Sequence, residues 1–149
     1  MAWHSLSLHR QRDGRIEVLV YSRPTHRTWA LDGLPEVVSP TATPRQLGEA
    51  VVRGLRRSLQ GMCVREDPDF ERFLAWNGAF NWSSYSRGVR AVDVVADFED
   101  EIGPVGLTPQ VRVRDGDFIP MMKKTVIVDG ADVTALGDAA RRAMTQAGG

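Results

Sequence analysis

Apolar residues at three- and four-residue spacing predict a helix over residues 43–58. Thr43 suits the N-cap and Pro44 the first helical position, while Gln46 stands where its side chain completes a capping box. We expect this helix to end near Gly61, which suits a C-terminal cap. Because its apolar face contains small residues, the helix is expected to pack closely on a sheet. That face consists of Leu47, Ala50, Val51, Gly54, Leu55 and Ser58.

A second helix with the same pattern is predicted 89 residues later, over residues 132–146. Leu-Gly-Glu-Ala at 47–50 corresponds to Leu-Gly-Asp-Ala at 136–139, and the cap Thr43 corresponds to Asp132. The chain is therefore interpreted as two copies of one unit, each a β-meander that ends in a helix. The positions of the second apolar face are Leu136, Ala139, Ala140, Ala143, Met144 and Ala147.

Strand patterns precede each helix. Residues 3–9 alternate in polarity and residues 16–21 form a β-branched run, so the Asp13-Gly14 turn between them predicts a hairpin. Pro109 is expected at an edge, a bulge or a strand start, because it cannot donate to a sheet. Most strands coincide under the offset of 89 residues, although the run after the first turn matches poorly. The other predicted strands span 28–31, 36–39, 89–95, 107–113, 118–119 and 125–128.

The middle of the chain differs from both units. Pro68 after the capping Asp67 starts a predicted helix that stops at Asn77-Gly78, and residues 82–88 predict a short helical turn. The segment is rich in aromatic residues, which we expect to pack in the core, with Trp82 and Tyr85 covering one patch of sheet. Trp76 is expected in the same core. Stacking on nucleobases, with Arg72, Arg87 and Arg90 nearby, is the alternative.

These patterns predict an α+β fold with a mainly antiparallel sheet packed by helices. A chain of 149 residues is long enough for one domain with a conventional core. Within it we expect a first unit over 1–60, a helical and aromatic insert over 61–88, and a second unit over 89–149.

Composition narrows the function classes. Nineteen basic and nineteen acidic residues give a formal net charge of zero, which argues against a dedicated nucleic-acid-binding protein. A single cysteine, Cys63, excludes an internal disulfide. The first residues lack the pattern of a signal peptide, and no apolar run reaches the roughly 18 residues that span a bilayer. We therefore expect a soluble cytoplasmic protein that does not bind membranes.

No motif of catalysis or metal binding is present. The histidines, His4, His9 and His26, do not stand at a metal-ligand spacing, and Cys63 has no activating partner nearby in sequence. The glycines at 103–106 lack the Lys-Ser/Thr ending of a phosphate loop. We expect no catalytic residue, metal or cofactor, although a small hydrolase without a recognisable motif remains an alternative.

Acidic residues gather in two stretches that could present a negative surface to a basic partner. Such stretches are more often simply solvated faces. The first stretch contains Asp93, Asp97, Glu99, Asp100 and Glu101. The second contains Glu66, Asp67, Asp69 and Glu71.

The order of these segments resembles a known family. A hairpin and the Leu-Gly-Glu-Ala helix are followed by residues 82–94, in which a Trp-x-x-Tyr turn leads to Arg90 and a strand. Residues 118–128 and the closing Leu-Gly-Asp-Ala helix complete the pattern. In this order the chain resembles the CdiI-like immunity proteins of contact-dependent growth inhibition (CDI) systems. The two aromatic residues of that family's Trp-x-x-aromatic turn correspond to Trp82 and Tyr85 in this chain.

The resemblance implies a non-enzymatic inhibitor that binds the C-terminal toxin domain of a cognate CDI effector, often a nuclease. Nucleases are commonly basic where they meet phosphates, so the two acidic stretches would serve as toxin-binding residues. No direct binding of nucleic acid is expected. The alternative is a nucleic-acid-binding or regulatory module that uses Arg53, Arg56, Arg57 and the aromatic insert.

Overall fold

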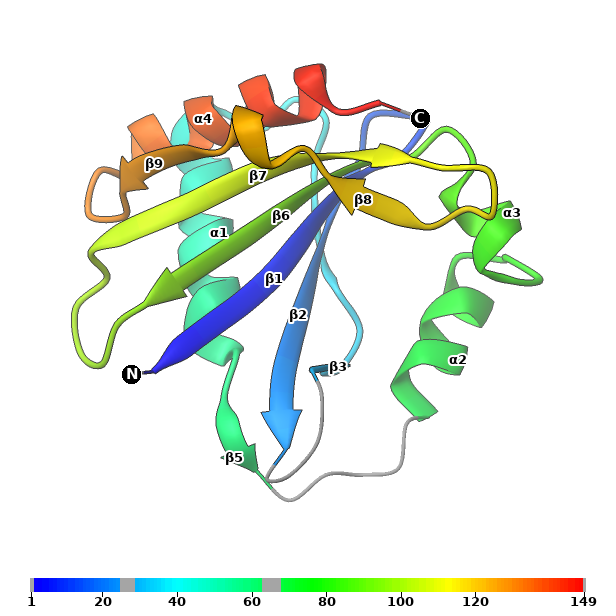
Figure 1. Cartoon of the computed structure of the whole chain (residues 1–149), viewed down its shortest axis with the longest axis horizontal. Helices are drawn as coiled ribbons and strands as arrows, with labels where there is room; N and C mark the ends of the chain where they lie inside the picture. The colour runs from blue at the N-terminus through cyan, green and yellow to red at the C-terminus, as the bar shows by residue number, and fades with distance from the viewer. Residues whose placement is uncertain (1, 25–28, 63–67, 149) are drawn as a thin grey trace.

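The computed structural model describes residues 2–24, 29–62 and 68–148, in which helices pack on a curled, mainly antiparallel sheet (Figure 1). This confirms the predicted α+β fold class. The helices are α1 (Pro44–Arg57), α2 (Pro68–Trp76), α3 (Trp82–Ser86) and α4 (Val133–Gln146), with a 3-10 turn at Met122–Lys124. The strands are β1 (Trp3–Arg10), β2 (Ile16–Pro24), β3 (Ala30–Leu31), β4 (Glu36–Val38), β5 (Gln60–Met62), β6 (Arg90–Asp97), β7 (Pro104–Arg112), β8 (Phe118–Pro120) and β9 (Val126–Asp129).

Strands β1 and β6 form the centre of the sheet, antiparallel and in register from Trp3 opposite Asp97 to Arg10 opposite Arg90. Strand β2 lies beside β1, and β7 lies beside β6. Beyond them, β3, β4 and β5 pair with β2, while β8 and β9 pair with β7. Pro109 lies inside β7, where the neighbour on one side changes from β9 to β8. The N–H that Pro109 lacks is therefore missing at the point where β7 changes its pairing partner. The predicted positions were an edge, a bulge or a strand start.

The two halves of the sheet contain the same order of elements. Helix α4 begins and ends 89 residues after α1. Strand β4, before α1, pairs with β2, and β9, before α4, pairs with the equivalent strand β7. The predicted caps are present in both helices: the Thr43 side chain accepts from the Gln46 N–H, and the Asp132 side chain from the Ala135 N–H. That the halves arose by duplication stays a prediction.

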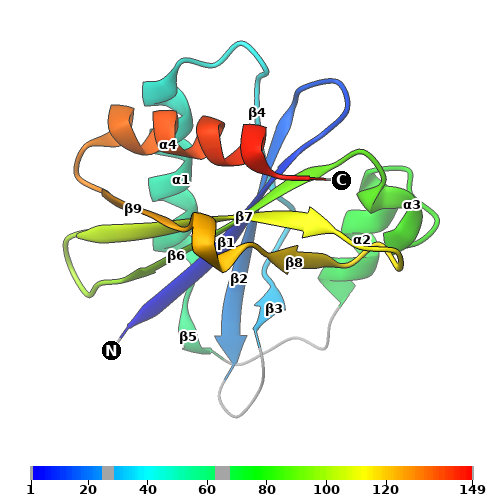
Figure 2. The same cartoon turned by 45° about the horizontal axis from the view of Figure 1, so that its top comes forward.

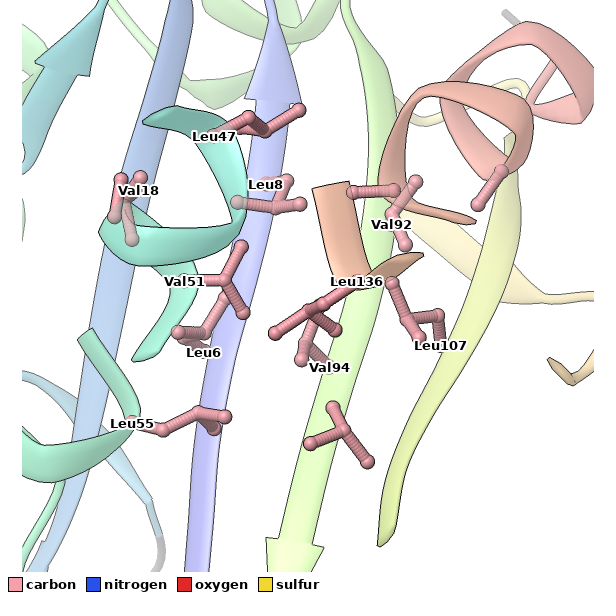
Figure 3. Close-up of a cluster of buried hydrophobic side chains, with 14 of the residues drawn as sticks. Leu6, Leu8, Val18, Leu47, Val51, Leu55, Val92, Val94, Leu107 and Leu136 are labelled. Carbon is pink, nitrogen blue, oxygen red and sulfur yellow. The ribbon is translucent and has the colours of Figure 1, made fainter. Parts of the chain in front are cut away.

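The main core lies between one face of the sheet and the two long helices (Figure 3). Leu47, Val51 and Leu55 extend from α1 toward β1 and β2, and Leu136 extends from α4 toward β6 and β7. A smaller core lies on the other face, where Phe73 of α2 packs with residues of α3 and the sheet. The insert thus covers part of the face that α1 and α4 leave free. The other buried members of the smaller core are Leu19, Leu31, Tyr85 and Val89.

Helices α1 and α4 cross at two glycines whose numbers also differ by 89 (Figure 2). A Cβ atom added to Gly48 would lie 1.7 Å from the carbonyl oxygen of Val133, at the start of α4. A Cβ atom added to Gly137 would lie 1.7 Å from the carbonyl oxygen of Pro44, at the start of α1. Only glycine permits this approach of the two backbones.

Helix α1 ends earlier than predicted, at Arg57, and the chain then enters the short strand β5. Ser58 explains the early end, because its side chain joins two strands. Its hydroxyl donates to the Tyr21 carbonyl oxygen at 2.5 Å and accepts from the Ser5 N–H at 2.9 Å. The predicted cap Gly61 therefore lies in β5, which pairs in parallel with β2.

In the insert, α2 begins at Pro68 as predicted, while its expected cap Asp67 lies outside the described residues. Trp82 and Tyr85 pack together, with ring centroids 5.2 Å apart, as their spacing predicts. Trp76, however, is 45% exposed, so its prediction as a core residue is wrong. The buried position on α2 belongs to Phe73 instead.

Replacing Gly48 by alanine tests the helix crossing. We expect Gly48→Ala to lower the free energy of unfolding by about 3 kcal/mol, because the new methyl group can be accommodated only if the helices move apart. Chemical denaturation measures this change. Gly103→Ala is the matched control, because no atom lies within 4 Å of its added Cβ, and it should change stability by no more than about 0.5 kcal/mol. Equal stability of both variants would contradict the close crossing.

Candidate functional site

Exposed acids gather at the β6–β7 turn, which lies at one end of the sheet (Figure 1). The turn is anchored to the protein by Phe98, whose ring stacks on His4 with 3.9 Å between ring centroids. Arg56 of α1 lies 5.8 Å from the Phe98 ring centroid and donates to the Asp100 carbonyl oxygen at 3.2 Å. One arginine therefore offsets part of the negative charge. The exposed acids of this acidic turn are Asp97, Glu99, Asp100 and Glu101.

An exposed part of the sheet adjoins the acidic turn. Trp3 of β1 pairs with Asp97 of β6 and is 43% exposed. Val95 and Ile127 pair with Gly106 from either side, and the glycine has no side chain to fill the space between them. Ile127 is 72% exposed. Aromatic and aliphatic side chains thus form an apolar surface beside the carboxylates.

Asp93, the remaining acid of the first predicted stretch, lies farther along β6. It pairs with Ser7 on one side and Thr108 on the other, and its side chain is half-buried. Burial raises the pKa of the Asp93 carboxyl group. It lies four positions before Asp97 along the strand, a distance of about 13 Å. The structure therefore does not join Asp93 to the acidic turn.

The second predicted acidic stretch lies apart from the first. Glu71 is exposed on α2, which lies on the opposite side of the molecule from the acidic turn in both views (Figures 1 and 2). Asp69 belongs to α2 but its side chain is not described, and Glu66 and Asp67 lie outside the described residues. Glu71, the one acid of this stretch whose side chain is described, therefore does not form a continuous surface with the acidic turn.

The residues of the alternative nucleic-acid surface are engaged elsewhere. Nε and Nη2 of Arg53 donate to the two oxygens of the Glu36 carboxylate, and the shorter of the two distances is 2.7 Å. Trp82 donates to the Gly116 carbonyl oxygen and lies edge-on to Phe118, so its ring is packed against the fold. Of the three helix arginines, only Arg57 is exposed and makes neither an ion pair nor a hydrogen bond among the described residues. This arrangement does not favour base stacking.

A buried polar cluster, which sequence reasoning did not find, joins α3 to the sheet. Glu17 of β2 is 0% exposed and His9 of β1 is 2% exposed. The Tyr85 hydroxyl donates to Glu17 Oε1 at 3.0 Å and lies 2.7 Å from His9 Nδ1. Gln11 Nε2 donates to both the Tyr85 hydroxyl and Glu17 Oε1. Within the described residues, Glu17 Oε2 has no hydrogen-bond partner.

Burial dominates the protonation of this cluster. It lowers the pKa of His9 to about 3 and raises the pKa of Glu17, against the opposing effect of the Tyr85 hydrogen bond. The Tyr85 hydroxyl has one proton, which it donates to Glu17 when Glu17 is ionised. The hydrogen bond between Tyr85 and His9 then requires that His9 carries a proton on Nδ1 and donates it to the Tyr85 oxygen. The three groups are closed off from solvent, and we assign them to the attachment of α3. The only signal in the sequence was an acid inside an apolar strand.

Within residues 2–24, 29–62 and 68–148, no three His, Cys, Asp or Glu side chains are grouped as metal binding would require. His26 and Cys63 lie outside these ranges. Among the described helices, none has both the length and the apolar composition needed to cross a membrane.

No family model matches the chain, and no curated protein matches its sequence. Two solved structures share the fold over nearly the whole chain. The protein of unknown function NMB0488 from Neisseria meningitidis matches with a TM-score of 0.77 and 13% identity, covering 97% of this chain and 95% of the other. A chain of the CdiA-CT/CdiI toxin and immunity complex from Yersinia pseudotuberculosis matches with a TM-score of 0.66 and 18% identity, covering 98% and 97%. The chain therefore shares the fold of these two structures.

Acidification tests the neutral state of His9. The unfolded histidine titrates near 6.5 and the folded one near 3, so the unfolded state binds the extra proton and stability falls as the pH drops through this window. Between pH 7 and pH 5 this loss amounts to about 2 kcal/mol. Glu17 and Asp93, whose pKa values are raised, act in the opposite direction. The measurement is therefore the difference in pH dependence between the wild-type protein and His9→Asn.

His9→Asn retains an amide near the Nδ1 position but does not titrate. We expect its stability to lack the His9 component, although it is lower at every pH because the smaller side chain leaves a cavity. Nitrogen NMR of the His9 ring should also show a neutral Nδ1–H tautomer at pH 5. Parallel stability curves for the two proteins, or a charged ring at pH 5, would contradict the assignment.

Proposed function

We propose that this protein is an immunity protein that binds and neutralises the C-terminal toxin domain of a cognate CDI effector. The observation that carries the proposal is its likeness to a chain of the CdiA-CT/CdiI toxin and immunity complex over nearly the full length of both chains. The order of motifs along the sequence supports the same family. The protein would act in the cytoplasm as an inhibitor without catalytic activity of its own.

The acidic turn and the adjoining apolar surface make up the proposed toxin-binding surface. Trp3 supplies a partly exposed aromatic side chain of the kind that anchors protein interfaces. Asp97 pairs with Trp3 across β1 and β6, and the exposed carboxylates of Glu99, Asp100 and Glu101 follow Asp97 in the turn. A nuclease toxin presents basic groups where it binds phosphates, so these carboxylates would occupy that position and exclude the substrate. Asp93 and the α2 stretch with Glu71 are proposed as secondary positions only.

We expect a toxin domain to be encoded beside this chain, and that domain provides the direct test of the proposal. Co-expression of the two proteins should restore growth that the toxin alone prevents, and the purified proteins should form a stable complex by gel filtration. A toxin with an inactivated catalytic residue serves as the control for binding without toxicity. Absence of both rescue and complex formation with that domain would overturn the proposed function.

Charge reversal tests the acidic turn. Glu99→Lys together with Glu101→Lys should lower the association rate with a basic toxin about tenfold at low salt, and the effect should shrink as salt screens the charges. Stopped-flow or surface-based kinetics at several salt concentrations measure the rate. Asp115→Lys with Asp117→Lys is the matched control, because it makes the same change in charge at two exposed residues of the β7–β8 turn. If both double variants associate equally fast, the acidic turn is not part of the interface.

A further inference from the structure

A cavity of about 530 Å³ lies at the end of the sheet opposite the acidic turn. The β1–β2 turn, the start of β6 and the C-terminal end of α4 come together around it (Figure 2). Four arginines line this arginine cavity, and they come from three different parts of the chain: Arg10, Arg12, Arg90 and Arg141. Its volume lies in the range of pockets that hold small ligands.

Three of the four guanidinium groups are held by carbonyl oxygens of the backbone. Arg12 Nε donates to the Arg87 carbonyl oxygen at 2.8 Å, and Arg141 donates to the Ala42 carbonyl oxygen. Arg90 donates to the carbonyl oxygens of Thr145 and Ala147, at the C-terminal end of α4. A guanidinium has five N–H donors, so each keeps donors for another partner. The backbone contacts therefore orient these three arginines and leave N–H donors available for a ligand.

None of these charges is neutralised within the described part of the chain. The described ion pairs involve Arg15, Arg45 and Arg53, and none of the four cavity arginines. Asp13, the one acid in the cavity lining, already binds Arg15 at 2.8 Å. Backbone carbonyls hold a guanidinium in place but supply no negative charge.

The central strands also place two of the charges against each other. Arg10 and Arg90 are directly opposite on β1 and β6, and side chains so paired lie about 5 Å apart at their Cβ atoms. Like charges in this position destabilise a sheet. Within the described residues, Arg10 has neither a hydrogen bond nor an ion pair to offset this repulsion. An anion between the two guanidinium groups would remove it.

The wall of the cavity depends on a glycine. Gly88 has a φ of +78°, and a Cβ atom there would lie 2.9 Å from Arg12 Cγ. Because Gly88 has no side chain, the Arg12 side chain can lie against the backbone of the segment that connects α3 to β6. The arginine cavity thus has one wall set by Gly88, and three of its four charges are held by backbone carbonyls.

We propose that the arginine cavity binds a small phosphate-bearing ligand of nucleotide size. Arginine forks match the oxygens of phosphate, and a phosphate monoester brings close to two negative charges, where a single carboxylate brings one. Four uncompensated arginines in a volume larger than a lone anion therefore fit a phosphate attached to an organic group. This binding does not depend on the proposed immunity function, because the cavity and the acidic turn lie at opposite ends of β1 and β6.

Calorimetric titration of the full chain with adenosine monophosphate (AMP), inorganic phosphate and adenosine tests this proposal. AMP should bind more tightly than phosphate, its affinity should fall as salt is raised, and adenosine should not bind. Arg10→Gln should weaken AMP binding about tenfold, because a charge-assisted hydrogen bond is lost. Arg57→Gln is the matched control, as it removes an exposed arginine at the far end of α1 and should leave binding unchanged.

Circular dichroism establishes that each variant is folded, and Arg141→Gln provides a second removal of charge at the cavity. Equal affinity in the wild-type protein and both cavity variants would overturn the proposal. So would the absence of AMP and phosphate binding, or tighter binding of an oligoglutamate peptide than of AMP. Binding of phosphate alone, as tightly as AMP, would restrict the site to the free anion and contradict a ligand of nucleotide size.

Discussion

The close crossing of α1 and α4 is the contact on which the rest of the arrangement depends. Gly48 of α1 lies against the start of α4, and Gly137 of α4 lies against the start of α1. Neither glycine has a side chain that would hold the helices apart. Both helices can then lie on the same face of the sheet and bury Leu47, Val51 and Leu136 against the central strands. Larger residues at these positions would displace one helix from that face. The apolar surface exposed by this displacement would lower the stability by roughly 25 cal/mol per Å².

Because the two long helices occupy one face, the other face is left for the insert and for the exposed apolar surface. The insert covers only part of it, through Phe73 and Tyr85. The cluster of Tyr85, His9 and Glu17 attaches α3 at that end, at the cost of a buried carboxylate whose Oε2 has no hydrogen-bond partner in the described part of the chain. The remaining part, around Trp3 and Ile127, stays exposed beside the acidic turn. The division of this face into a covered and an exposed part thus follows from the placement of the helices.

Sequence reasoning predicted the fold well where the signals are local. Capping residues Thr43 and Asp132 and the turn at Asp13-Gly14 were found because each acts on neighbouring backbone groups. The end of α1 was misplaced because Ser58 bonds to β1 and β2, which are distant in sequence. Trp76 was placed in the core by its composition, while the helix orientation on the sheet gives that position to Phe73.

The candidate surfaces could be predicted only in part for the same reason. The acids of the turn are contiguous and therefore visible in sequence, but their separation from Asp93 and from Glu71 depends on the tertiary fold. The arginine cavity joins residues up to 131 positions apart, from Arg10 to Arg141, and had no local pattern. Of its four arginines only Arg90 was noted, as a base beside the aromatic insert and through the family resemblance.

The register of β1 with β6 separates two clusters of opposite charge. Carboxylates follow one end of this strand pair and arginines the other, while the formal net charge is zero. Without a net charge, there is no long-range attraction that acts regardless of orientation. A charged partner is instead rotated into alignment once it comes within the Debye length, about 8 Å at physiological ionic strength. The protein would therefore select the orientation of its encounters more strongly than their frequency.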